Sequence, residues 1–264
     1  MDWAYKAVLT GIAVAAVMMA ARLLGRHAAG MFAGLPIISV PAIAWLVAEQ
    51  GVEPAVLSAV GGLAACTGAI VFALVFDHAA RRHGAAGALW RALLALGAAL
   101  ALLGTLGSEP PLLLVLSLVA ALLAWRRVAR SPSPAGWVRT LRGEPWLSAS
   151  LAGLVSAGAS QLAVEVGPFW TGVIAALPII SGFALVHLRR AGAPGDIRRF
   201  VRGYVPGVAA KAMFLFSFAM LAPRTGAAWS LALAGVVGAA TALAWSARAS
   251  RTGSGHGLET RAGQ

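Results

Sequence analysis

The chain has 264 residues, of which 59% are hydrophobic and 11% are charged. An ordinary soluble domain is about 45–50% apolar and about 25% charged, so a soluble fold could not bury this much apolar surface. The net charge of +12 would suggest nucleic acid in a soluble protein, but here the basic residues stand between apolar blocks. We therefore expect membrane anchors and no nucleic-acid partner. A single cysteine, Cys66, and scattered histidines predict no disulfide framework, no metal and no cofactor.

Apolar blocks follow one another along the chain, most of them long enough to cross ~30 Å of hydrocarbon as a helix. They cover residues 4–24, 31–49, 54–76, 86–106, 110–125, 146–166, 168–188, 203–222 and 226–247. The first block is long for a signal peptide and ends in Arg22 and Arg26, so we interpret it as a helix of the mature protein. The sequence predicts an all-α, polytopic transmembrane helical bundle of about nine helices.

The connections between the blocks alternate in charge. Arginine-rich connections begin at Arg22, Arg81, Arg126, Arg189 and Arg248, and the connections between them contain Glu49, Glu53, Glu109 and Glu165. The positive-inside rule places the arginine-rich connections in the cytoplasm. This pattern predicts nine spans, an N-terminus outside, a cytoplasmic C-terminus, and the lipid bilayer with its anionic headgroups as the partner of the basic face.

A short segment is repeated. Residues 30–39 read GMFAGLPIIS and residues 172–181 read GVIAALPIIS, an offset of 142 residues. Four of the nine isoleucines of the chain lie in the two LPIIS runs, so the match is not a product of apolar composition. With the alternating charge, it predicts two inverted four-helix repeats, 1–106 and 146–248, joined by a linker helix and basic loop at 107–145 and followed by a disordered tail at 249–264.

The glycine-rich turn followed by an apolar helix entered through GLP or ALP, around residues 25–45 and 165–185, resembles small bacterial inner-membrane proteins of the GlpM-like type. Those proteins are similar to one four-helix unit, whereas this chain resembles two units fused in tandem. The resemblance implies a bacterial inner (plasma) membrane location. It implies no activity.

The repeated prolines mark the first candidate site. Pro36 and Pro178 each fall inside an apolar block. A proline there removes a backbone hydrogen bond and exposes the carbonyl four residues earlier, which is that of Phe32 in the first block and that of Ile174 in the second. Such carbonyls must find a partner or line a wet cavity. Ser39 and Ser181 follow by about one turn and offer hydroxyls. The alternative is that both prolines only kink their helices.

Lys211 is the second candidate, because it lies near the centre of its block. A charge at that depth costs at least ~2.5–3.5 kcal/mol, which marks it as functional, and a lysine stem is too short to reach the headgroups from there. We expect it to face the protein interior. Gln161 and Glu165 lie one turn apart near the outer end of the sixth block and complete the candidate substrate-binding set, although Glu165 also fits a plain helix end.

No catalytic triad, phosphate-binding loop, dinucleotide fingerprint or zinc-protease motif is present, so we expect no enzyme and no catalytic residue. The leading hypothesis is a permease for a small solute or ion with a midplane site between inverted repeats. The alternative is a lipid-handling or regulatory scaffold protein that acts through its arginine-rich cytoplasmic face. Homo-oligomerisation stays open.

Overall fold

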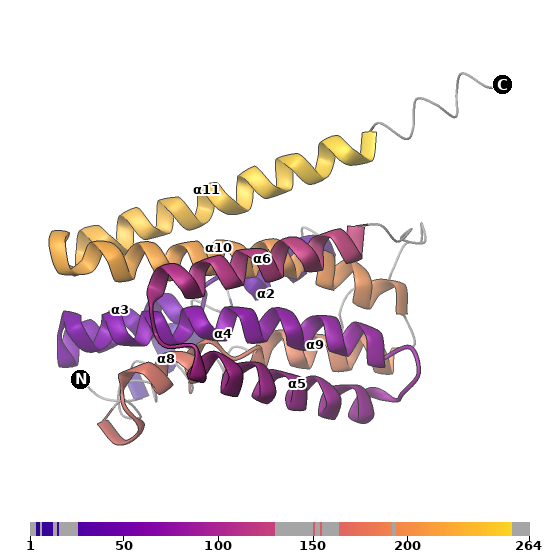
Figure 1. The fold of residues 1–264 in the computed structure, drawn as a ribbon, viewed down its shortest axis with the longest axis horizontal. Helices are drawn as coiled ribbons and strands as arrows, with labels where there is room; N and C mark the ends of the chain where they lie inside the picture. The colour runs from indigo at the N-terminus through magenta and orange to yellow at the C-terminus, as the bar shows by residue number, and fades with distance from the viewer. Residues whose placement is uncertain are drawn as a thin grey trace.

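The computed structural model describes residues 4–5, 7–12, 15, 26–129, 150, 154, 164–191 and 194–254. Within these residues the chain is helical and contains no strand. The helices are α2 (Arg26–Gly34), α3 (Ser39–Gln50), α4 (Val52–Ala79), α5 (Ala85–Thr105), α6 (Pro110–Ala129), α8 (Pro168–Ala176), α9 (Ile179–Arg190), α10 (Pro194–Thr225) and α11 (Ala227–Ser254). They lie mostly along one common axis (Figure 1).

Seven stretches of the described residues are long and apolar enough to cross a membrane. Two of them, Gly30–Gln50 and Pro168–Arg190, are interrupted helices, and the other five are continuous. The protein is therefore an all-helical, multi-pass integral membrane protein. The first and sixth predicted spans, 4–24 and 146–166, lie largely outside the described residues, so the count of nine spans stays a prediction.

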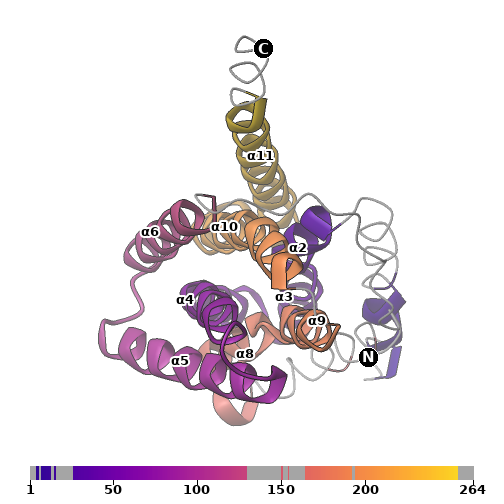
Figure 2. The ribbon, with the colours of Figure 1, turned by 90° about the vertical axis from the view of Figure 1, so that its right-hand side faces the viewer.

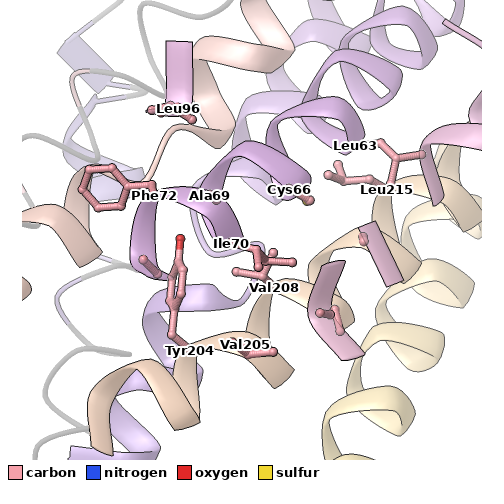
Figure 3. Close-up of a cluster of buried hydrophobic side chains, with 14 of the residues drawn as sticks. Leu63, Cys66, Ala69, Ile70, Phe72, Leu96, Tyr204, Val205, Val208 and Leu215 are labelled. Atoms are coloured by element: carbon pink, nitrogen blue, oxygen red, sulfur yellow. The ribbon is translucent and has the colours of Figure 1, made fainter. Parts of the chain in front are cut away.

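Two long helices form the centre of the bundle. α4 and α10 pack against each other, and α4 is surrounded by α5, α6, α8 and α10 (Figure 2). The largest fully buried side chains come mainly from these two helices, among them Phe72 and Phe76 of α4 and Phe214 and Phe218 of α10. Figure 3 shows such side chains of α4 and α10 meeting in the core.

The outer helices bury side chains on one face and expose apolar side chains on the other. α5 buries a stripe of Ala88, Ala92, Leu96 and Leu103 against α4, as an amphipathic helix does. Its other face exposes large apolar residues, and so do α6 and α11; examples are Trp90, Leu102, Val115, Leu123, Val236 and Leu243. A surface this apolar is suited to lipid and not to water.

α10 begins at Pro194, nine residues before the predicted block 203–222. The predicted start was late because Asp196 and Arg198 lower the hydropathy of the first turns. The same turns nevertheless bury Ile197 and Phe200, and this packing extends the helix beyond the apolar block. At the other end of the chain α11 continues to Ser254, into the tail that was expected to be disordered from residue 249.

The helix bounds recur with the offset of the repeated motif. α8, α10 and α11 begin 142 residues after α2, α4 and α5, and α2 and α8 are both nine residues long. The packing recurs as well: α2 packs on α10 as α8 packs on α4, and α11 packs on α10 as α5 packs on α4. The order of the helices and their packing therefore recur at this offset.

α4 and α10 occupy the same place in this sequence of helices and run antiparallel. Near one end Arg198 of α10 forms an ion pair with Asp77 of α4, with 3.1 Å between guanidinium nitrogen and carboxylate oxygen. Toward the other end Leu215 of α10 lies against Gly62 of α4. Residue numbers thus rise along one helix as they fall along the other.

Candidate functional site

Both interrupted spans break at the repeated LPIIS motif. Leu35 N–H donates to the Phe32 carbonyl at 3.2 Å and Leu177 N–H donates to the Ile174 carbonyl at 3.2 Å. The next turn is also the same in both: Ile37 N–H reaches the Leu35 carbonyl and Ile179 N–H reaches the Leu177 carbonyl, each at 2.8 Å. A bond that spans two residues closes a γ-turn, and Pro178, with φ −78° and ψ 53°, has the dihedral angles of the inverse form.

This geometry corrects one sequence prediction. The prolines do not expose the carbonyls of Phe32 and Ile174, because the tightened last turns of α2 and α8 supply N–H donors to both. They also do more than kink a continuous helix, since each span stops and restarts. The repeated motif therefore presents a helix C-terminus and a helix N-terminus within a few residues of each other, twice.

The two breaks enclose one small cavity of about 20 Å³. Its lining comes from the break of α2 and α3, the break of α8 and α9, and the side of α10. The polar members of the lining are Ser39, Ser181, Tyr204 and Lys211. A cavity of roughly 10–15 Å³ or more accommodates one water molecule, so this one has room for a single water-sized particle.

Lys211 lies near the middle of the candidate span Gly195–Thr225 and is only 7% exposed. The structure thus places it in the protein interior, where the sequence predicted it. Its Nζ donates a hydrogen bond of 3.1 Å to the carbonyl of Ala176, the last residue of α8. The C-terminal end of a helix carries partial negative charge, which stabilises an ammonium there.

Three hydroxyl groups accompany the ammonium. Ser181 Oγ donates to the Pro178 carbonyl at 3.1 Å, and Tyr204 lines the same cavity. Ser39 is buried at the start of α3, and its Oγ has no hydrogen-bond partner among the residues that the structure describes. A buried hydroxyl without a partner is costly, so this group is available to whatever occupies the cavity.

Tyr204 is the member of the cavity that the sequence analysis missed. It is fully buried, stacks on Phe200 and reaches from α10 toward α4 in Figure 3. A signal was present: Tyr204 is one of two tyrosines in the chain and precedes Lys211 by seven residues, or two helical turns. That spacing puts both side chains on one face of a helix.

The other predicted site residues lie elsewhere. Pro36 is half-buried between Leu35 and Ile37, both of which line the cavity, but it does not line the cavity itself. Glu165 is exposed, just before α8, and does not belong to the lining. Gln161 lies outside the described residues. Within the part of the chain that is described, no carboxylate lines the cavity and no group of His, Cys, Asp and Glu is suited to a metal ion.

A second hollow, of about 450 Å³, opens on the flank of the bundle. It lies between α5 and α9 over Phe72 of α4, and its lining is apolar except for Arg190 at the end of α9. Pro178 lines it as well, so this groove reaches the same helix break that borders the polar cavity.

No protein-family model, no curated protein and no solved structure matches this chain.

Proposed function

We propose that this chain is a permease for a small solute or ion, whose site is the cavity between the two helix breaks. The observation that carries the proposal is the convergence of both breaks and a buried lysine on one cavity at mid-span. Interrupted helices present backbone charge at membrane depth, and transporters use such ends to hold substrates and coupling ions. A protein that only anchored lipid headgroups would not need a polar cavity at that depth.

The architecture of the proposal is a pair of inverted repeats. The recurring helix bounds, the recurring packing and the antiparallel course of α4 and α10 support this arrangement. Exchanging the conformations of two such units converts a state open to one side into a state open to the other. We further propose that the chain is a tandem of two GlpM-like units in a bacterial inner membrane, with its arginine-rich connections in the cytoplasm.

Cysteine labelling tests the permease proposal. Ser39→Cys and Ser181→Cys, each made in a Cys66→Ala background, replace two hydroxyls that line the cavity. The cavity is too small for a charged methanethiosulfonate reagent, so labelling requires that it open. We expect both cysteines to react, slowly, with reagent added to either side of sealed vesicles. Exposed Glu165→Cys is the matched control and should react from one side only.

A cavity that never opens would contradict the proposal. In that case neither cysteine reacts from either side while the Glu165→Cys control is labelled to completion. The alternative function, lipid handling at the basic face, would then be favoured, since the apolar groove between α5 and α9 ends at Arg190 and suits an acyl chain with an anionic headgroup.

A further inference from the structure

The charge of the cavity points to the class of its occupant. Among the described residues that line the cavity, Lys211 alone carries a formal charge and none is an aspartate or glutamate. Position 69, which precedes Lys211 by the repeat offset of 142 residues, is an alanine, so the positive charge has no counterpart in the first unit. The site is therefore positive and asymmetric.

The backbone adds to the positive potential. α3 and α9, each of 12 residues, start at the cavity, and their first residues line it. The first turn of a helix leaves N–H groups without intrahelical partners and carries partial positive charge, which favours anions. The opposite helix end, the carbonyl of Ala176, already holds the ammonium of Lys211. A metal cation would have to displace that ammonium, whereas an anion would not.

Ser39 supplies an independent observation. Its hydroxyl is 4% exposed, lines the cavity and has no partner among the described residues. A serine hydroxyl can donate a proton to an anion, and a hydrogen bond to a charged group is stronger than one between neutral groups. The free hydroxyl and the ammonium offer donors to one water-sized space, and the partial positive charge of the two helix starts adds to their effect.

We propose that the cavity binds one small monovalent anion, of halide size, held by Lys211, Ser39 and the N-termini of α3 and α9. This inference deepens the permease proposal and rests on it only for the claim that the bound anion crosses the membrane. Anion binding does not require transport and is tested separately.

The experiment measures the thermal unfolding of the purified full-length protein in detergent at constant ionic strength. Sodium chloride and sodium bromide are each compared with sodium gluconate, whose anion is too large for the cavity, and with choline chloride. We expect the small anions to raise the unfolding midpoint in a saturable way, with sodium and choline chloride equivalent, because a ligand that binds only the folded state stabilises it.

Two variants and a control locate the site. Lys211→Met keeps the stem volume and should abolish the anion effect. Ser39→Ala should weaken apparent anion affinity by about tenfold or more, the effect of one hydrogen bond to a charged group. Ser117→Ala removes a buried serine outside the cavity and should leave the affinity unchanged. If Lys211→Met does not fold, the comparison of salts and the Ser39→Ala variant still test whether the cavity binds an anion.

Three results would overturn the inference: stabilisation that follows the cation, an anion effect that persists in Lys211→Met, or no difference between chloride and gluconate. The two proposals can fail separately. Anion binding with these dependences, combined with cysteines that are never labelled, would refute the permease and keep the anion site. Cysteines that are labelled from both sides, combined with no anion effect on the unfolding midpoint, would keep the permease proposal and refute the anion site.

Discussion

Individual glycines determine how closely α8 approaches α4 and how closely α2 approaches α10. A Cβ atom added to Gly172 of α8 would overlap the carbonyl of Ser58 on α4, and one added to Gly30 of α2 would overlap the carbonyl of Phe200 on α10. Both residues of the second pair are related to those of the first by the offset of 142. Small residues allow helix backbones to pack closely where no hydrophobic force from water drives association.

Gly172→Ala should therefore destabilise the protein. The added methyl group cannot be accommodated unless α8 moves away from α4, and overpacking of this kind costs typically about 1–3 kcal/mol. Thermal unfolding in detergent should show a lower midpoint for this variant. Gly97→Ala is the matched control, because a Cβ there meets no atom within 4 Å. Equal midpoints for the two variants would contradict the close packing of α8 on α4.

At this scale the sequence revealed part of the cavity. Ser39, Ser181 and Lys211 were predicted because a repeated motif and a charged residue within an apolar block can both be recognised in the sequence. Tyr204 and Ala176 were not, because a buried tyrosine looks like core and a backbone carbonyl has no side-chain signature. Glu165 was included because it lies one turn from Gln161 near the outer end of the sixth block, but its side chain is exposed.

At the scale of elements, each LPIIS motif ends one helix and begins another. The sequence located both prolines, but not the γ-turn that separates the helices, because a proline within an apolar block predicts a kink as readily as a break. The break at Pro178 matters for the site in a specific way. It leaves the Ala176 carbonyl at a helix end, where it accepts the hydrogen bond from Lys211.

This contact predicts an energetic coupling between Pro178 and Lys211. Pro178→Ala restores an N–H and favours a continuous helix, in which the Ala176 carbonyl would accept from Ile180 and release the ammonium. A double-mutant cycle of Pro178→Ala with Lys211→Met, measured as free energies of unfolding in mixed micelles, should give an interaction of about 0.5–3 kcal/mol.

Pro36→Ala provides the control for this cycle. Pro36 occupies the equivalent position in the other break, but Lys211 bonds to the carbonyl of α8 and not to that of α2. Its effect should add to that of Lys211→Met within about 0.5 kcal/mol. If both prolines show the same coupling energy with Lys211, the coupling does not arise from the hydrogen bond between Lys211 and the Ala176 carbonyl.

At the scale of the whole molecule, hydropathy was sufficient to find the continuous spans. α4, α5 and α6 match predicted blocks within a few residues, and so does the membrane-spanning part of α11, Ala227–Arg248, because lipid demands apolar side chains around most of each helix. The start of α10 was not found, because a helix that leaves the membrane changes from apolar to amphipathic without ending. The packing of α2 on α10 and of α8 on α4 was also beyond the sequence, since it depends on contacts between distant segments.

The helices arrange the charged connections at two opposite ends of the bundle. In Figure 1 the connection of α4 to α5, which holds Arg81 and Arg82, lies at the same end as the connection of α9 to α10. The turn between α3 and α4, next to Glu49 and Glu53, lies at the other end, with the connection of α5 to α6. One arginine-rich face and one acidic face is the distribution that the positive-inside rule associates with cytoplasm and exterior.

Reporter fusions test this orientation and the number of spans together. Fusions after residues 85, 135, 195 and 255 should report cytoplasm, and fusions near residues 52, 108 and 167 should report the exterior. The fusions near 135 and 167 are the decisive pair, because the sixth predicted span, 146–166, separates them and lies largely outside the described residues. If 135 and 167 report the same side, that span does not cross the membrane. The α8–α9 span would then run in the same direction as the α2–α3 span, and the inverted-repeat proposal would fall with it.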